Sequence, residues 1–414
     1  MKKKIVVIGG GFAGLRLCKE LDRKGYDVLL IDRQNHHQFQ PLFYQVASAR
    51  LDPSSISFPF RSIFHRSKRV DVLFAEVSAV VPEEKKIRTD VGDVSYDRLV
   101  IATGCRTNYF NNSDLEKYAF SMKTTTEAFQ IRNQILLGFE EVAAKGWEAC
   151  PGSDALVIVG AGPTGVELAG AFAEMKTQML PGDFPQVDFS RLKIILIESG
   201  KETLGNMSEK SRTASGKFLE ELGVTIRCGE VVASYDGLNL VLKSGEQLQS
   251  RYVIWAAGVK GNLIDGLPSA EIVRNRYRVD RQFQLNGYSD IYAIGDIAYM
   301  ETPKWSAGMP QIATVAIEQA VLLAKNWSLT DRGKPTADYE FHNPGSMATV
   351  GKHKAVVDLP SIQFSGRLAW FFWMFLHLML ILNAKNKLII FINWAWSYIT
   401  NNSSHRLIFK KGLK

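Results

Sequence analysis

Cysteine is scarce in this chain, and its few cysteines lie far apart. Four occur in 414 residues, Cys18, Cys105, Cys150 and Cys228, with no CxxC or CxxxxC pair among them. That spacing argues against a disulfide framework, a zinc or iron–sulfur site, and a redox-active dithiol. We therefore expect reduced, packing cysteines and no bound metal.

The chain also lacks an apolar run as long as the roughly 20 residues that a membrane-spanning helix needs. Its most apolar stretches, residues 370–382 and 388–396, are separated by NAKNK at 383–387. At the other end, lysines at positions 2–4 lead directly into an apolar run that glycines interrupt at 9–11. This is not the pattern of a secretory signal, so we expect the chain to stay on the cytoplasmic side.

Acidic residues are absent from residue 361 onward, where seven bases supply +7 of the net charge of +8. These bases are Arg367, Lys385, Lys387, Arg406, Lys410, Lys411 and Lys414. Because they accompany Trp-rich apolar segments, they indicate a membrane-surface anchor with anionic lipids rather than a nucleic-acid partner. We predict two short in-plane helices. A dimer interface, a buried core and a transmembrane hairpin remain alternatives.

Two glycine-rich loops are the most informative feature that is present. GGGFAG at residues 9–14 follows an apolar, β-branched run at 5–8, and GAGPTG at 160–165 follows another at 155–159. Each loop opens a helical pattern. Glycines in this strand–turn–helix context let the backbone approach a pyrophosphate that the helix N-terminus binds. Two loops predict two bound dinucleotides.

A carboxylate ends the strand that follows each loop. Asp32 lies 23 residues beyond Gly9, and Glu198 lies 38 beyond Gly160 because residues 181–185 lengthen the connection. A carboxylate accepts a hydrogen bond from a ribose 2′-hydroxyl and repels a 2′-phosphate. Glu198 therefore favours NAD(H), although nearby Lys201 leaves NADP(H) open.

Three further strand ends carry small or acidic residues. They are Ala102-Thr103-Gly104, residues 256–258 ending in Gly258, and Gly295-Asp296 after an apolar strand. We also expect a helix from Pro310, since the apolar residues that follow recur at helical spacing. With both loops, this layout resembles that of the flavoproteins with two dinucleotide-binding domains.

That resemblance implies an α/β fold with two Rossmann-like domains and a C-terminal amphipathic membrane-anchoring region. Residues 1–112 and 286–340 are expected to form the FAD domain, 113–285 the NAD(H) domain, and 341–414 the membrane-association region. The ligands expected for FAD are Gly9, Gly11, Gly14, Asp32, Ala102, Thr103, Gly104, Gly295 and Asp296. Those expected for NADH are Gly160, Gly162, Gly165, Glu198 and Gly258.

With the basic, aromatic tail, the chain resembles a type II NADH:quinone oxidoreductase, the single-subunit respiratory NADH dehydrogenase that does not pump protons. The resemblance rests on GAGPTGVE at 160–167 and on the tail, and it covers nearly the full length. It implies hydride transfer from NADH to FAD, then two-electron transfer to a membrane quinone. It places Glu167 near the reacting rings, where it would orient the nicotinamide or relay protons. We expect a homodimer on the cytoplasmic face.

The expected quinone site departs from the family pattern. That family often carries AQxAxQQ where this chain has ATVAIEQ at 313–319, so Thr314 and Glu318 replace two glutamines. Gln311, one turn earlier, is a possible substitute. We predict Gln311, Thr314 and Glu318 as quinone contacts.

Other functions stay open at this point. Sulfide:quinone oxidoreductases need paired cysteines, and ferredoxin reductases need no basic tryptophan-rich tail. A redox-sensing scaffold that binds FAD and NADH without rapid turnover is also compatible with the sequence.

Overall fold

The computed structural model describes residues 4–400 and 406–409, without the side chains of residues 397–399. Lys410, Lys411 and Lys414 of the basic tail lie outside these residues. The chain forms two compact units. Unit 1 comprises Met1–Gln38, Phe58–Arg106 and Val259–His342, and unit 2 comprises Phe39–Ser57, Thr107–Gly258 and Asn343–Lys414.

These boundaries differ from the domain limits drawn from the sequence at 112/113, 285/286 and 340/341. The stretch Phe39–Ser57, which the sequence alone placed with the first domain, belongs to unit 2. Its helix α2 (Phe43–Ala47) packs against α5 (Thr125–Lys145) and α6 (Pro163–Glu174). Which nucleotide each stretch binds remains a prediction.

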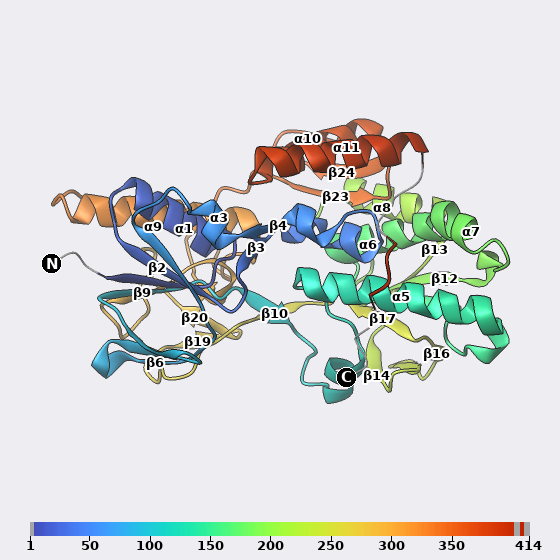
Figure 1. Cartoon of the computed structure of the whole chain (residues 1–414), viewed down its shortest axis with the longest axis horizontal. Coiled ribbons are helices and arrows are strands. Elements are labelled where there is room, and N and C mark those ends of the chain that lie inside the picture. The colour runs from blue at the N-terminus through green and yellow to red at the C-terminus, as the bar shows by residue number, and fades with distance from the viewer. Residues whose placement is uncertain (1–3, 401–405, 410–414) are drawn as a thin grey trace. The chain divides into compact units, whose positions relative to one another are not determined.

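Unit 1 is built on a parallel sheet with strand order β21-β9-β1-β2-β5. The strands are β1 (Ile5–Ile8), β2 (Val28–Asp32), β5 (Val70–Phe74), β9 (Arg98–Ile101) and β21 (Ile291–Ala293). All four residues of β1 are buried, as expected for a parallel strand covered on both faces. Helices α1 (Phe12–Arg23) and α9 (Ala313–Thr330) lie side by side along the sheet (Figure 1).

Shorter elements complete unit 1. They are β3 (His36–Gln38), α3 (Phe60–Ile63), the antiparallel sheet β6 (Val77–Val81), β7 (Lys86–Thr89) and β8 (Gly92–Ser95), and the sheet β19 (Ile272–Val273), β20 (Arg276–Arg278) and β22 (Ala298–Tyr299). The strands β4 (Ser57–Pro59), β10 (Cys105–Thr107) and β18 (Val259–Gly261) lie at the points where the chain changes unit. Helix α9 begins at Ala313, not at Pro310 as the sequence suggested, because Ile312 keeps an extended backbone.

Unit 2 repeats the same plan with a parallel sheet of order β13-β12-β11-β17. Its strands are β11 (Ala155–Val159), β12 (Lys193–Glu198), β13 (Val224–Cys228) and β17 (Tyr252–Trp255), and every residue of β11 is buried. The sheet β14 (Val232–Tyr235), β15 (Asn239–Leu242) and β16 (Gln247–Gln249) accompanies it. The predicted pair of Rossmann-type units is confirmed.

The helices of unit 2 are well marked in the sequence. Besides α2, α5 and α6 they are α4 (Ser113–Tyr118), α7 (Leu180–Asp183), α8 (Glu209–Glu221), α10 (Arg367–Leu380) and α11 (Ala384–Thr400), with a π-helical turn at Met175–Met179. Thr124 and Glu127 form a reciprocal capping box that begins α5. Pro163 occupies the first turn of α6, where its fixed φ suits a helix start.

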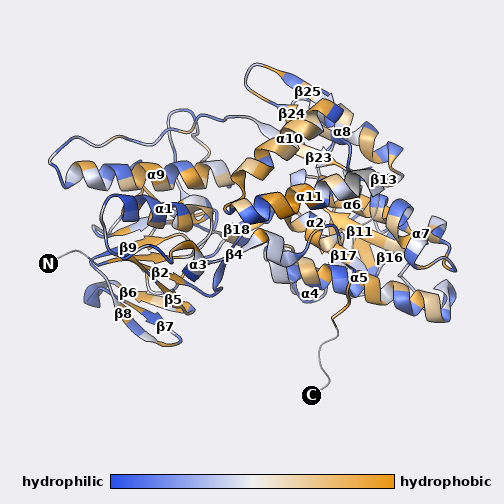
Figure 2. Ribbon diagram, turned by 45° about the horizontal axis from the view of Figure 1, so that its top comes forward, coloured by the Kyte–Doolittle hydropathy of each residue, from blue (hydrophilic) through white to orange (hydrophobic). Residues whose placement is uncertain are grey.

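The C-terminal part of unit 2 is an antiparallel sheet followed by two helices. The strands are β23 (Ser346–Val350), β24 (Lys354–Asp358) and β25 (Gln363–Gly366). Helix α10 packs on β24 and contacts α11 (Figure 1), and both helices are largely hydrophobic (Figure 2). Two helices separated near residue 383 confirm the sequence prediction. Within the described part of the chain, none of the helices has the length and apolar character to cross a bilayer.

Candidate functional site: two dinucleotide cradles

The glycine loop of unit 1 is shaped by two close backbone approaches. Gly9 has φ +97, and a Cβ there would lie 2.4 Å from the carbonyl oxygen of Ala102. A Cβ on Gly14 would lie 1.8 Å from the carbonyl oxygen of Gly9. By contrast, a Cβ on Gly11 would meet nothing within 4 Å. The loop therefore needs glycine for its turn and its packing, and it leaves open space in front of the helix N-terminus where phosphates bind.

The loop of unit 2 has the same geometry. Gly160 has φ +102, and a Cβ there would lie 2.7 Å from the amide nitrogen of Ala257. A Cβ on Gly165 would lie 1.8 Å from the carbonyl oxygen of Gly160, whereas one on Gly162 would meet nothing within 4 Å. Each loop thus has two glycines that a close backbone approach requires and one glycine that faces open space. This shape fits a dinucleotide pyrophosphate in both loops.

Asp32 lies beside the first loop. Its carboxylate accepts hydrogen bonds from the backbone N–H of Gly10 at 2.6 Å and of Gln34 at 2.7 Å. Burial raises the Asp32 pKa, and these two donors oppose the shift. Asp32, Gly9 and Thr103 line one cavity of about 190 Å³. The structure therefore brings together three of the residues predicted to bind FAD, although they lie far apart in the chain.

Strand order explains that convergence, because β1 lies between β2 and β9, and β9 pairs with β21. The carboxyl ends of these parallel strands meet at one edge of the sheet, which places Ala102, Thr103 and Gly104 with the Gly9 loop. Gly295 follows β21 at the same edge with φ +76.

Asp296 is held by groups from two segments of unit 1. The Cys105 thiol donates to its carboxylate with an Sγ–Oδ2 distance of 3.0 Å, and the Gln311 amide donates to its backbone carbonyl at 2.9 Å. The Gly295 N–H donates to Oε1 of Gln319, which is buried, at 2.7 Å. Gln319 was missed as a site residue. It is the last glutamine of the family pattern, and this chain retains it. The prediction named only the two positions at which glutamine is replaced.

The predicted quinone contacts occupy different environments. Gln311 bonds to the Asp296 carbonyl, as described above. Thr314 and Glu318 are exposed on the same face of α9. Glu318 accepts a hydrogen bond from the hydroxyl of Tyr339 at 3.0 Å. Their contact with quinone remains a prediction.

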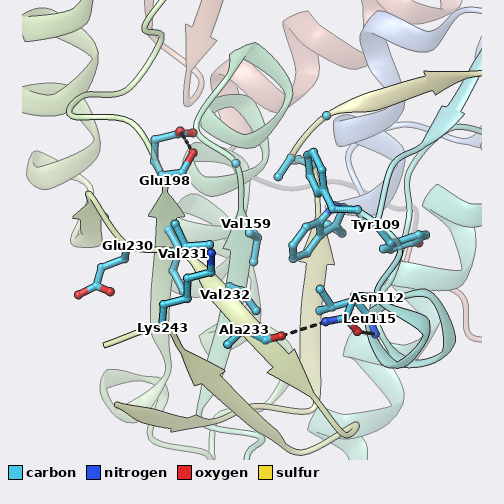
Figure 3. A pocket seen from close by; sticks show the side chains of 18 of the residues that line it. Tyr109, Asn112, Leu115, Val159, Glu198, Glu230, Val231, Val232, Ala233 and Lys243 are labelled. Carbon is cyan, nitrogen blue, oxygen red and sulfur yellow. Dashed lines mark hydrogen bonds between the residues drawn. The ribbon is translucent and has the colours of Figure 1, made fainter. Parts of the chain in front are cut away.

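In unit 2, the second loop opens into a cavity of about 800 Å³. Gly160, Gly162, Glu198 and Gly258 all line it, as the sequence predicted for one ligand. Figure 3 shows Glu198 above Lys243 on one side and Tyr109 on the other.

The carboxylate of Glu198 bonds to the backbone of the second glycine loop, as that of Asp32 bonds to the first. Its carboxylate accepts hydrogen bonds from the N–H of Ala161 at 2.6 Å and of Gly200 at 2.7 Å. Lys243 and the aromatic residues Phe110 and Trp255 also line the cavity and were not predicted. Phe110 has φ +53, an uncommon conformation for a bulky residue, and no sequence motif marks it.

Glu167 lies two residues beyond Gly165 in α6 and is partly buried. Its Oε1 accepts a hydrogen bond of 3.4 Å from the backbone N–H of Thr349 in β23. Burial raises the Glu167 pKa to about 8, and the Thr349 bond opposes that shift. A carboxyl group with a pKa this close to neutral can both accept and release a proton during turnover.

The same face of α6 docks on β23. A Cβ on Gly170 would lie 2.6 Å from the backbone nitrogen of Gly351, so glycine is required for the close approach. Farther along, Glu174 accepts from the N–H of Lys352 at 2.6 Å and pairs with Arg50. Glu167 is therefore on a helix whose position is fixed by the C-terminal sheet.

Comparisons with known proteins agree with this arrangement. The model of the pyridine nucleotide-disulphide oxidoreductase family matches residues 3–320, and that of the NDH2 C-terminal domain matches residues 343–401. The chain thus belongs to the pyridine nucleotide-disulphide oxidoreductase family.

A relative from Mycobacterium tuberculosis named type II NADH:quinone oxidoreductase Ndh is 30% identical over 96% of this chain and 89% of its own length. One from Staphylococcus aureus is 26% identical over 86% of this chain and 89% of its own. This chain belongs to the type II NADH:quinone oxidoreductase family.

Solved structures show the same fold. NDH2 from Plasmodium falciparum in complex with NADH superposes with a TM-score of 0.90 at 22% identity, covering 99% of this chain and 100% of that one. The sulfide:quinone oxidoreductase of Aquifex aeolicus gives 0.69 at 19% identity, covering 91% and 90%.

Proposed function

We propose that this protein oxidises NADH and reduces a membrane quinone, with FAD as the cofactor between them and without proton pumping. The observation that carries the proposal is the pair of matching glycine cradles, each with a carboxylate at the end of the next strand. When bound, FAD supplies a hydride acceptor that can return two electrons to a quinone.

The residues of unit 1 would hold FAD through the loop that contains Gly11 and through Asp32, whose carboxylate lies in the cavity beside it. Asp296, fixed by Cys105 and Gln311, would contact the ribityl chain and pyrophosphate. The open space at Gly11 and the rigid carboxylates support this assignment.

In unit 2, the loop containing Gly162 and the carboxylate of Glu198 would hold NADH. Because Glu198 is already bonded to Ala161 and Gly200, it presents a fixed negative charge that disfavours a 2′-phosphate. Glu167 would exchange a proton with the reacting groups, since its pKa lies near neutral.

The acceptor would reach the enzyme from the bilayer, at the cytoplasmic face. Helices α10 and α11 expose large apolar side chains, among them Leu368, Phe375 and Trp396, and residues 361–409 include four of the bases. Such helices lie in the membrane interface and bind anionic lipids. A homodimer, with Gln311, Thr314 and Glu318 near the quinone, completes the proposal.

A turnover experiment tests it. The purified protein should retain FAD through gel filtration and consume NADH only when a short-chain quinone is added. Sulfide in place of NADH should give no quinone reduction. Quinone reduction by sulfide, or NADH oxidation that ignores quinone, would overturn the proposal.

A further inference from the structure

A buried hydrogen bond joins helix α11 to helix α2. The indole N–H of Trp394 donates to Oε1 of Gln45 at 2.7 Å, and both side chains are buried. An indole nitrogen can only donate. Trp394 therefore fixes the orientation of the Gln45 amide, with its oxygen toward α11 and its NH₂ group directed elsewhere.

The Gln45 amide continues the series. Its Nε2 donates to the hydroxyl oxygen of Tyr44 at 3.0 Å, and that hydroxyl lies 3.0 Å from Oγ1 of Thr349 in β23. The Tyr44 hydroxyl oxygen accepts from Gln45, and in its bond with Thr349 either hydroxyl can be the donor. Tyr44 and Thr349 are both buried, so water does not compete for these bonds.

The series ends at Glu167. Thr349, whose hydroxyl bonds to that of Tyr44, is also the residue whose backbone N–H donates to Glu167 Oε1. A continuous series of hydrogen bonds thus joins α11 to the residue that donates to Glu167, and the indole fixes the direction of the first two bonds. The first donor, Trp394, lies in the helix whose opposite side exposes Leu388 and Trp396.

We propose that Trp394, Gln45 and Tyr44 are positioning residues that hold Thr349 against Glu167, so that helix α11 controls proton exchange at this carboxyl group during quinone reduction. The inference rests on the role of Glu167 in the proposed function. It adds a route by which the C-terminal helices act on that residue.

Few other charged groups surround this series. They include Arg50, Glu174, Lys352, His353 and His377, together with Arg132, which is buried in α5 where that helix packs on α2. Arg50 and Glu174 pair with each other, and His377 stacks on Trp373 at 4.1 Å. Burial lowers the His377 pKa to about 4, so this ring stays neutral across the range of the test.

The variant Trp394→Phe removes the indole donor and keeps an aromatic ring. Without that donor, Gln45 and Tyr44 can reverse their bonds, and Thr349 loses its fixed partner. We expect the apparent pKa of flavin reoxidation by a short-chain quinone to rise by roughly half a unit to one unit. Reduction of the flavin by NADH should keep its wild-type rate.

Trp147→Phe is the matched control, because Trp147 lies in the same unit and its indole nitrogen has no hydrogen-bond partner among the residues that the structure describes. Tyr44→Phe should shift the profile in the same direction as Trp394→Phe. The double variant should shift it no further than Tyr44→Phe alone, since both changes break one series. Melting temperatures of all variants identify any that fold poorly, and Gln45→Leu then replaces Trp394→Phe.

Three outcomes separate the claims. Shifted profiles in Trp394→Phe and Tyr44→Phe, with a wild-type profile in Trp147→Phe, would support the inference. A wild-type profile in Trp394→Phe, or additive shifts in the double variant, would overturn it. A wild-type enzyme whose reduced flavin is not reoxidised by quinone would overturn the proposed function itself.

Discussion

The backbone N–H of Thr349 donates to the carboxylate of Glu167, so β23 of the C-terminal sheet is bonded to the helix that opens at the second glycine loop. This is one of several contacts in unit 2 between the helix that follows the glycine loop and the C-terminal sheet. Removal from water raises the pKa of Glu167 far above that of an exposed glutamate, and the bond from Thr349 opposes this shift.

Replacing Glu167 by Gln should change how stability depends on pH. The folded pKa of about 8 exceeds the unfolded value of about 4.3, so between them the folded state binds a proton that the unfolded chain has lost. The contribution of Glu167 is thus fully present below the unfolded pKa and is lost as pH rises toward 8, by at most about 1.4 kcal/mol per pH unit. Glu167→Gln removes this loss.

Urea unfolding of wild type and Glu167→Gln at pH 5, 6.5 and 8 measures the effect. The free energy of unfolding of the wild type should fall relative to the variant as pH rises. Glu116→Gln, at an exposed carboxylate of the same unit, should run parallel to the wild type. Parallel curves for Glu167→Gln would show that this carboxyl group titrates normally.

Two glycines of the first loop should respond differently to alanine. Gly11→Ala places its Cβ in open space, so the protein should fold with nearly unchanged melting temperature but bind less FAD. Gly14→Ala forces a Cβ to 1.8 Å from the Gly9 carbonyl and should cost about 1–3 kcal/mol of stability or more. FAD content and thermal unfolding separate the two effects. Equal FAD content in Gly11→Ala and wild type would contradict the cradle assignment.

Glu198→Gln should relax the choice of nucleotide. The neutral amide cannot repel a 2′-phosphate, and hydrogen bonds to a charged group contribute about 1.5–3 kcal/mol. The preference for NADH over NADPH, measured as the ratio of kcat/KM values, should therefore fall about tenfold or more. Ser199→Ala, which removes a hydroxyl donor to the same carboxylate, is the control and should keep the preference. An unchanged ratio in Glu198→Gln would mean that another residue selects the nucleotide.

The combined variant Leu368→Glu/Phe375→Glu/Trp396→Glu tests the membrane face of α10 and α11. All three side chains are exposed, so the variant protein should keep its melting temperature and its bound FAD. Sedimentation with vesicles that contain anionic lipid should drop about tenfold or more, because three apolar contacts become repulsive charges. Phe74→Glu, at an exposed phenylalanine of unit 1, should sediment like the wild type. Undiminished sedimentation of the triple variant would place the membrane contact elsewhere.

Much of the fold could be predicted because its signals are local. A short apolar run, a glycine loop and a helical pattern follow one another within about fifteen residues of Ile5 and again of Ala155. Gly9 and Gly160 then adopt the same positive φ and the same close approach to a neighbouring strand end. The period of the pattern fixes the element type, and the glycines mark the turn.

Relationships between distant segments could not be predicted this way. Nothing near residue 45 shows that Gln45 meets Trp394, 349 positions away, or that α2 packs in unit 2. Likewise, the helix pattern around Glu318 does not show that its carboxylate accepts a hydrogen bond from Tyr339. Such contacts depend on how whole elements dock, which one sequence does not reveal.

The most direct test of the central claim is to follow flavin absorbance by stopped flow, adding NADH first and a short-chain quinone second. If the two cradles serve one reaction, NADH should bleach the flavin rapidly. Quinone should then restore the flavin absorbance at a rate no slower than steady-state turnover. A flavin that NADH bleaches but quinone leaves reduced would contradict the account, since electrons would then leave the protein by another acceptor.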